Sequence, residues 1–355
     1  MNYKETLLFI GKCLTITHEK NNRDLVEEKI KSGLVDWDAV VKVSTGQYVF
    51  PASYCNLKRA NFLHYLPADL VEYMQHITNL NRERNELIIK QAKEINELLL
   101  SNNITPIFLK GTGNLLEGLY EDIAERMVGD IDFLVNPEKL KLTVNILKEN
   151  GYHEKTLDYL DNTILNRHYP KITKEGEIAA IEVHYKMISN EKAFDFNFIK
   201  KSVTKLVNNA TVLSYNNQVL LTCFNKQISD KGQWTKTISL RNSYDLYLLS
   251  KQTPVKTVLS NFDHSESNSL KNFLSVTNYI FNSPRSLEDI RTHKTKKYIK
   301  KVLFFMNNPK KSAANKKKWE LYFLYKHRFS VILKSFYVKE YRKYLFDRFF
   351  NQPKP

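Results

Sequence analysis

Apolar residues in the first hundred positions recur at helical spacing. From Leu87 to Leu98 the apolar side chains return every three or four residues, and neither glycine nor proline interrupts the pattern. Residues 24–30 show the same spacing. The pattern therefore predicts a helical N-terminal region over residues 1–100.

The pattern changes between residues 104 and 185, where short apolar runs alternate with helical stretches. Strands are expected at residues 104–109, 130–135, 166–172 and 178–185, and helices at residues 110–120 and 137–150. This strand–helix–strand–helix–strand–strand order is typical of a mixed sheet covered by helices. The sequence therefore predicts an α+β fold.

Helical spacing returns near residue 195 and continues into a tail that mixes basic and aromatic residues. The expected parts of the chain are a helical N-terminal region (1–100), a sheet-containing core (101–195), a helical region that completes a cleft with the core (196–290) and a basic helical tail (291–355).

The expected strand at residues 130–135 carries the most informative polar pattern. Its apolar residues share one face, and Asp130 and Asp132 share the other, because side chains alternate along a strand. Two carboxylates one pleat apart repel each other, and a divalent cation removes that cost. The pair therefore predicts a site for Mg²⁺ or Mn²⁺ that also binds the phosphates of a nucleotide.

A third acid follows in the strand expected at residues 178–185, where Glu182 and His184 share a face. If this strand lies near the Asp130/Asp132 strand, Glu182 completes a set of three metal-binding carboxylates. His168 and His184 are candidates for auxiliary roles, and hydrogen-bonded structural roles are the alternative for both.

A phosphate-binding turn is expected where a strand enters a helix at Lys110-Gly111-Thr112. The amides at a helix N-terminus favour anions, and a lysine beside them adds positive charge. Arg126 offers a planar fork of donors that suits a phosphate. We therefore predict that these four residues bind the nucleotide. The alternative for Arg126 is an ion pair with Glu121, Asp122 or Glu125.

Three motifs in this order resemble a known family: Leu109-Lys110-Gly111, the segment from Arg126 to Val135, and the segment from Ile181 to Tyr185. They are similar to those of a bacterial uncharacterised nucleotidyltransferase family within the DNA polymerase β-like superfamily. The resemblance implies a nucleotidyltransferase-type mixed sheet with flanking helices. It also implies that Asp130, Asp132 and Glu182 are catalytic metal ligands, and that an NMP group moves from an NTP to an acceptor hydroxyl with release of pyrophosphate.

The excess of positive over negative charge lies in the tail. Residues 291–355 contain 19 Lys and Arg against 3 Asp and Glu, which equals the net charge of +16 of the whole chain. Aromatic residues lie between these cations, as on many surfaces that bind nucleic acid. The tail therefore predicts a polyanionic partner, most simply RNA, and solvated helix faces are the alternative.

Other functions fit parts of the same pattern. The nucleotidyltransferase could be a toxin or defence protein that modifies tRNA, which the basic tail would suit. A glycosyltransferase also uses an Asp-x-Asp pair to hold a metal and a nucleotide-sugar. A silent nucleotide- or RNA-binding protein is the third alternative, and the three acids argue against it.

Cysteine usage and the N-terminal segment bear on location. The three cysteines, Cys13, Cys55 and Cys223, are far apart and form no metal-binding or disulfide pattern. The first residues lack the features of a signal peptide, and no apolar run is long enough to span a membrane. We therefore expect a cytoplasmic protein.

Overall fold

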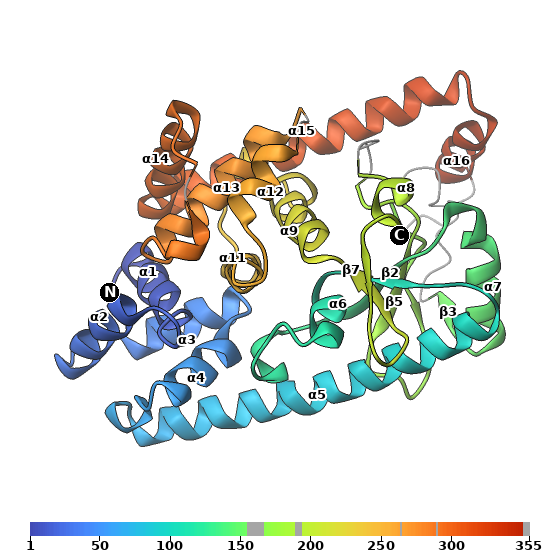
Figure 1. Cartoon of the computed structure of the whole chain (residues 1–355). Helices are drawn as coiled ribbons and strands as arrows, with labels where there is room; N and C mark the ends of the chain where they lie inside the picture. The colour runs from blue at the N-terminus through green and yellow to red at the C-terminus, as the bar shows by residue number, and fades with distance from the viewer. Residues whose placement is uncertain (155–166, 189–193, 263–264, 289, 351–355) are drawn as a thin grey trace.

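The computed structural model describes residues 1–154, 167–188, 194–262, 265–288 and 290–350. A mixed sheet lies at one end of the molecule, and helices from both halves of the chain form the other end (Figure 1). There α1 (Tyr3–Cys13) packs against α13 (Ser267–Ile280) and α14 (His293–Asn307), so the N-terminal region meets the C-terminal half.

Seven strands form the sheet: β1 (Ile107–Phe108), β2 (Asp130–Leu134), β3 (His153–Glu154), β4 (Ile172–Thr173), β5 (Ala180–His184), β6 (Val203–Lys205) and β7 (Thr211–Leu213). Their order across the sheet is β3-β4-β5-β2-β1-β7-β6. Strand β2 is parallel to β5 and antiparallel to β1. The mixed sheet of the predicted α+β fold is therefore confirmed.

The central strands β2 and β5 each bury one apolar face. Ile131, Phe133 and Val183 have no exposed surface. Because side chains alternate, the opposite face of the same two strands carries Asp132 and Glu182. The apolar pattern that forms the core thus also fixes which way the acids point.

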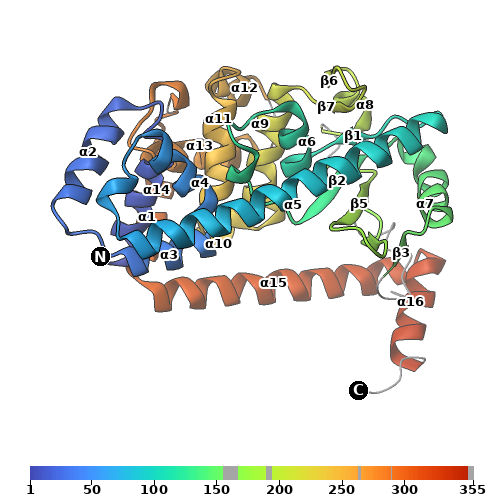
Figure 2. The ribbon, with the colours of Figure 1, turned by 90° about the horizontal axis from the view of Figure 1, so that it is seen from below.

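The long helix α5 (Ala68–Ser101) runs from the N-terminal helices to the sheet (Figures 1 and 2). Gln91 exchanges two hydrogen bonds with the backbone of Ala179, donating to its carbonyl at 3.0 Å and accepting from its N–H at 3.1 Å. Asn85 donates to the carbonyl of Arg126 at 2.7 Å. Helix α5 therefore positions both the start of β5 and the segment that carries Arg126.

The predicted helices of the first 150 residues are confirmed. The remaining helices of this part are α2 (Lys20–Lys31), α3 (Trp37–Gly46), α4 (Phe50–Arg59), α6 (Lys110–Glu117) and α7 (Leu140–Glu149). The strand expected at residues 166–172 is shorter, with a bridge between His168 and His184 followed by β4. Its first expected residue, Asn166, lies outside the described residues.

The sequence predicted a helical region over residues 196–290, but this region also contains two strands. Strands β6 and β7 lie between α8 (Phe196–Ile199) and α9 (Tyr215–Phe224), and β7 pairs in parallel with β1 and buries Val212 completely. This pairing joins residues far apart in the chain, which local spacing does not reveal. The helices and helical turns that follow β7 are α9, a π-helical turn (Asn225–Ser229), α10 (Gly232–Thr235), α11 (Leu240–Leu249) and α12 (Val255–Asn261).

The described part of the tail, up to residue 350, is helical as predicted and contains α14, α15 (Pro309–Ser335) and α16 (Lys339–Phe350). Helix α15 lies along one side of the molecule (Figure 2). Its side chains Trp319 and Phe323 pack against Trp234 of α10, with ring centroids 6.4 and 4.9 Å away. Among the helices of the described residues, none combines the length and the apolar character that a membrane-spanning segment requires.

Candidate active site

Two acids on neighbouring strands form the centre of the site. The parallel pairing of β2 with β5 sets Asp132 directly opposite Glu182, so both carboxylates leave the same face of the sheet at adjacent positions. Only 3% of Asp132 and 7% of Glu182 is exposed. Two adjacent buried acids require cations or hydrogen-bond donors close by.

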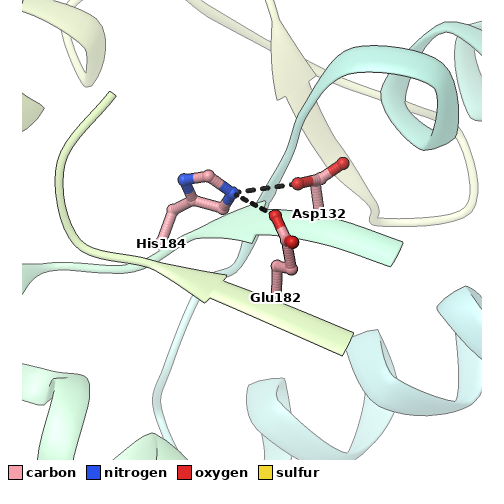
Figure 3. A group of neighbouring side chains, drawn as sticks. All are labelled: Asp132, Glu182 and His184. Atoms are coloured by element: carbon pink, nitrogen blue, oxygen red, sulfur yellow. Dashed lines mark hydrogen bonds and ion pairs between the residues drawn. The ribbon is translucent and has the colours of Figure 1, made fainter. Parts of the chain in front are cut away.

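His184 forms a compact group with these two acids (Figure 3). Its Nε2 lies 2.9 Å from Asp132 Oδ1 and 3.4 Å from Glu182 Oε2. One potential ligand atom from each of the three residues lies within 4.8 Å of the others. The predicted auxiliary residue His184 is thus in direct contact with two of the predicted metal ligands.

Asp130 lies one pleat away from Asp132, at the more exposed end of β2. Lys171 joins it to the central pair, with Nζ 2.7 Å from Asp130 Oδ2 and 3.1 Å from Glu182 Oε1. All three predicted acids therefore lie together on one face. The sequence carries no motif around Lys171, and only the folded chain reveals its contact with the acids.

Lys110 is the second cation bound to the acids. Its Nζ lies 2.5 Å from Asp132 Oδ1 and 3.6 Å from Glu182 Oε2. The backbone of Lys110 has a φ of 51°, in the left-handed region, which is strained for a residue with a side chain. This conformation occurs between β1 and α6, where it turns the chain into the helix and directs the lysine toward the acids.

The next two residues let α6 approach β2 closely. A Cβ on Gly111 would lie 2.9 Å from Val128 Cγ2, so a side chain does not fit there without movement of its neighbour. Thr112 is buried and donates from Oγ1 to the carbonyl of Asp130 at 3.1 Å. The nucleotide contacts of Gly111 and Thr112 stay predictions, and the observed role of Thr112 is to hold β2 against α6.

Arg126 is buried in an ion pair with Asp245 of α11. Its Nε donates to the two carboxylate oxygens at 3.0 and 3.1 Å, and one terminal nitrogen lies 3.0 Å from Oδ2. Burial acts to lower the pKa of Arg126, but the charge of Asp245, its hydrogen bonds and the neighbouring Tyr120 together outweigh burial and raise the pKa. The pair connects the sheet to the helical region, and a nucleotide contact by Arg126 stays a prediction.

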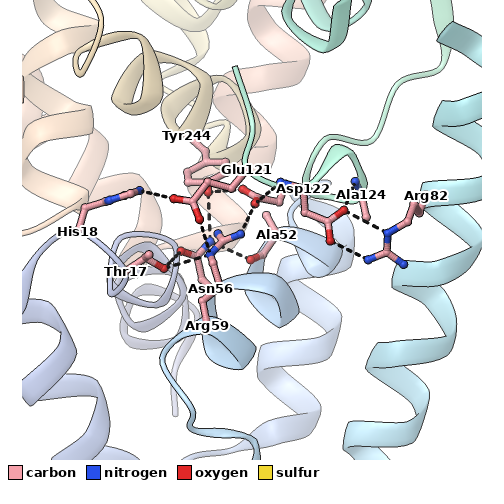
Figure 4. Close-up of polar contacts among 11 residues, drawn as sticks. Thr17, His18, Ala52, Asn56, Arg59, Arg82, Glu121, Asp122, Ala124 and Tyr244 are labelled. Carbon is pink, nitrogen blue, oxygen red and sulfur yellow. Dashed lines mark hydrogen bonds and ion pairs between the residues drawn. The ribbon is translucent and has the colours of Figure 1, made fainter. Parts of the chain in front are cut away.

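The three acids considered as alternative partners of that guanidinium bind other arginines (Figure 4). Arg59 lies 2.6 Å from Glu125 and 3.2 Å from Glu121. Arg82 lies 2.7 Å from Asp122. The alternative of a local ion pair is therefore wrong, because the chain supplies a more distant acid to Arg126 and more distant arginines to these acids.

A cavity of about 250 Å³ separates the acids from the helical region. Lys110, Gly111, Asp130, Asp132 and Glu182 line its sheet side. Asn225 and Asp230, at the two ends of the π-helical turn, also line the cavity, together with residues of α9 and α11. The remaining residues around it are Arg126, Met127, Val128, Gly129, Arg167, His168, Thr222, Arg241, Asn242 and Asp245.

The charge states of Glu182 and His168 at the cavity follow from their burial and from neighbouring groups. Burial acts to raise the pKa of Glu182, but its hydrogen bond with His184 and the charge of Lys110 outweigh burial and hold the pKa below its usual range. Burial lowers the pKa of His168, whose Nε2 lies 4.0 Å from Glu182 Oε2. At neutral pH Glu182 is therefore ionised and His168 is neutral.

The donor set fits a divalent cation. Asp130, Asp132 and Glu182 offer carboxylate oxygens, which Mg²⁺ and Mn²⁺ prefer, and His184 adds a nitrogen that suits Mn²⁺ better than Mg²⁺. Two lysines balance the acids in the structure. A bound cation with two positive charges would take over that role and free the lysines for an anionic ligand.

Comparison with known proteins places these residues in a family. Residues 33–268 match the family described as uncharacterised nucleotidyltransferase, and this range includes the sheet, the acids and the cavity. No curated protein and no solved structure matched the chain. Because the matched range covers well over half of the sequence, the chain belongs to the uncharacterised nucleotidyltransferase family.

Proposed function

We propose that this protein is a metal-dependent nucleotidyltransferase that moves an NMP group from an NTP to an acceptor hydroxyl and releases pyrophosphate. The observation that carries the proposal is the register of β2 and β5, in which Asp132 lies beside Glu182 at the cavity wall. Membership of the family supports the reaction class. We also propose the DNA polymerase β-like superfamily as the wider relationship.

The residues of the chain bind and orient the reactants. Asp130, Asp132 and Glu182 would hold Mg²⁺ or Mn²⁺, which when bound supplies positive charge beside the reacting phosphate. Lys110, once released from its acid, would donate to a phosphate oxygen. His168 is neutral at the cavity wall, so it is available to accept the proton of the attacking hydroxyl.

The first test of this function is direct. The full chain is incubated with each α-labelled NTP, with Mg²⁺ or Mn²⁺, and with cellular RNA or a metabolite extract. Transfer of the label to an acceptor supports the proposal. Transfer from UDP-sugars, with no transfer from any NTP, would instead establish the glycosyltransferase alternative.

Lys110→Met is expected to raise the KM for NTP by roughly 5- to 150-fold, because a charged hydrogen bond to a phosphate contributes about 1–3 kcal/mol. The control is Lys148→Met, which removes a lysine that pairs with Glu154 outside the cavity. Steady-state kinetics measure both variants. An unchanged KM in Lys110→Met would mean that the phosphates bind away from this lysine.

We further propose that the tail binds a polyanionic acceptor, with RNA as the simplest case. On α15, Tyr325 is 63% and Phe329 is 62% exposed, and Lys326 and Arg328 lie between them. Exposed aromatic rings stack on bases and cations bind phosphates. Asn315 of the same helix donates to the carbonyls of α10, next to the cavity wall. A tRNA-modifying toxin or defence enzyme is one form of this proposal.

Exchange of Lys317, Lys318 and Arg328 for glutamine is expected to weaken RNA binding and to spare NTP binding. The slope of log K against log salt should fall by about 2–3, because each lost phosphate contact changes it by about 0.7–0.9. Fluorescence anisotropy over a salt series measures this slope.

The matched control exchanges three exposed lysines of the body, Lys90, Lys93 and Lys141, for glutamine. This variant has the same net charge and should keep the slope. If the full chain binds no RNA at low ionic strength, the RNA hypothesis ends and a small-molecule or glycan acceptor is favoured.

We propose a cytoplasmic location for this reaction. Cys13, Cys55 and Cys223 are buried free thiols, which fits a reducing compartment. Burial raises the pKa of each thiol, so the three cysteines act as core side chains and not as nucleophiles.

A further inference from the structure

Two arginines of the cavity wall have no carboxylate partner among the described residues. Arg167 lies before β4, and Arg241 lies in the first turn of α11. The other arginine of the wall, Arg126, has its charge balanced by Asp245. Charge that is buried or half-buried without a counter-ion is costly, and a bound anion removes that cost.

Arg167 is held in place by neutral groups. One of its terminal nitrogens donates to Asn225 Oδ1 at 3.2 Å and to Ser229 Oγ at 2.7 Å. These contacts connect it to both ends of the π-helical turn and fix the guanidinium at the cavity. Because neither acceptor is charged, the positive charge of Arg167 remains available to a ligand.

Arg241 lies in a less favourable environment. Its Nε is buried and has no hydrogen-bond partner among the described residues. Burial and the nearby positive charge of Arg126 lower the pKa of Arg241, and the more weakly acting charges of Asp245 and Asp230 do not offset them. The centre of the guanidinium lies 5.0 Å from the ring of Tyr48, which orients it without neutralising it.

The two acids of the helical region that line the cavity, Asp230 and Asp245, form no ion pair with these arginines among the described residues. Asp245 is bound to Arg126. Asp230 also lines the cavity, yet within the described parts of the chain it forms no ion pair of 4.0 Å or less with Arg167 or Arg241. The cavity therefore contains two guanidinium groups that form no ion pair within the described residues, in addition to the three acids.

We propose that Arg167 and Arg241 bind the β- and γ-phosphates of the NTP, and hence the leaving pyrophosphate, in the cavity that Asp132 and Glu182 also line. This inference rests on the proposed function. Planar guanidinium groups bind phosphate oxygens with two parallel hydrogen bonds, which a single lysine does not provide. The acids and the two arginines would then act on opposite ends of the triphosphate.

The division of roles follows the reaction. The acceptor oxygen forms a bond with the α-phosphorus, and the bond from that phosphorus to the oxygen bridging the α- and β-phosphates breaks. The electron pair of the broken bond leaves with pyrophosphate, and the hydroxyl proton passes to solvent or to a basic group of the wall. The two arginines stabilise the charge that develops on the leaving group.

Binding of inorganic pyrophosphate to the full chain tests the proposal. Isothermal titration calorimetry in EDTA isolates the contribution of the protein's own cations. Arg167→Met and Arg241→Met should each weaken pyrophosphate binding about tenfold or more, which corresponds to about 1.4 kcal/mol. The control Arg285→Met removes the same charge from a surface outside the cavity and should change the affinity less than twofold.

Two further variants separate binding from folding. Arg167→Lys and Arg241→Lys keep the charge but lose the planar fork, so they should bind pyrophosphate with intermediate affinity. Unchanged affinity in both methionine variants would overturn the proposal. If those variants do not fold, unchanged affinity in both lysine variants would overturn it as well.

The same measurements distinguish this inference from the proposed function. Wild-type affinity for pyrophosphate in the arginine variants, together with NMP transfer by the unmodified chain, overturns only the assignment of the two arginines. Loss of pyrophosphate binding in these variants supports the assignment even if no acceptor receives an NMP group, in which case the proposed reaction is the part that fails.

Discussion

Asp132→Asn is expected to abolish NMP transfer, with a loss of about 10³-fold or more in kcat/KM. The change keeps the shape of the side chain and removes one negative charge from the group formed with Glu182 and His184. A weaker metal site loses several kcal/mol of transition-state stabilisation, and each 1.4 kcal/mol corresponds to a factor of ten. Initial rates with labelled NTP measure the effect.

Metal binding and folding are measured on the same variant. Titration with Mn²⁺ should show weaker binding, and the melting temperature should remain close to that of the unmodified chain, because an amide can still accept from Lys110. Glu182→Gln should have a similar effect, and the double variant should lose little more, since residues that act as a unit are not additive. Full turnover by Asp132→Asn would exclude this acid from the metal site.

The strands that carry these acids could be predicted because the alternation of apolar and polar residues is visible within a short stretch of the sequence. Ile131, Phe133 and Val135 recur at every second position, which predicts a strand, and the same alternation puts Asp130 and Asp132 on its other face. The same reasoning located β5 and Glu182. What the sequence left open was the pairing of the two strands, which the structure resolves as a parallel ladder with Asp132 beside Glu182.

The partners that complete the site could not be predicted, because they come from distant parts of the chain. Asp245 lies 119 residues from Arg126, and Lys171 lies 41 residues from Asp130. Local charge spacing favours pairs three or four residues apart and carries no information on such contacts. Strands β6 and β7 were missed for the same reason, since β7 depends on its pairing with β1.

Asp245→Asn is expected to lower the free energy of unfolding by about 3–5 kcal/mol, because it leaves the buried guanidinium of Arg126 without its counter-ion. Arg241 adds to this cost, since its positive charge already opposes that of Arg126. Tyr120 also loses the carboxylate that accepts its hydroxyl proton in a hydrogen bond of 2.7 Å. Urea unfolding followed by circular dichroism measures the change.

A comparison with a half-exposed pair tests whether burial is the cause. Removing the partner of Arg82 with Asp122→Asn should cost about 1 kcal/mol or less, because solvent screens this ion pair. The double variant Arg126→Met/Asp245→Leu should recover much of the stability lost in Asp245→Asn, since it removes the buried guanidinium of Arg126 together with its counter-ion. A cost below about 1 kcal/mol for Asp245→Asn would contradict the role assigned to the pair.

The double variant also decides between the two roles considered for Arg126. If the guanidinium only joins the sheet to the helical region, a stable Arg126→Met/Asp245→Leu protein should keep its KM for NTP near the value of the unmodified chain. If Arg126 contacts the nucleotide, that KM should rise in a protein whose stability has been restored. The three nitrogens of Arg126 already bind Asp245 and the carbonyl of Met127, so we expect the first result.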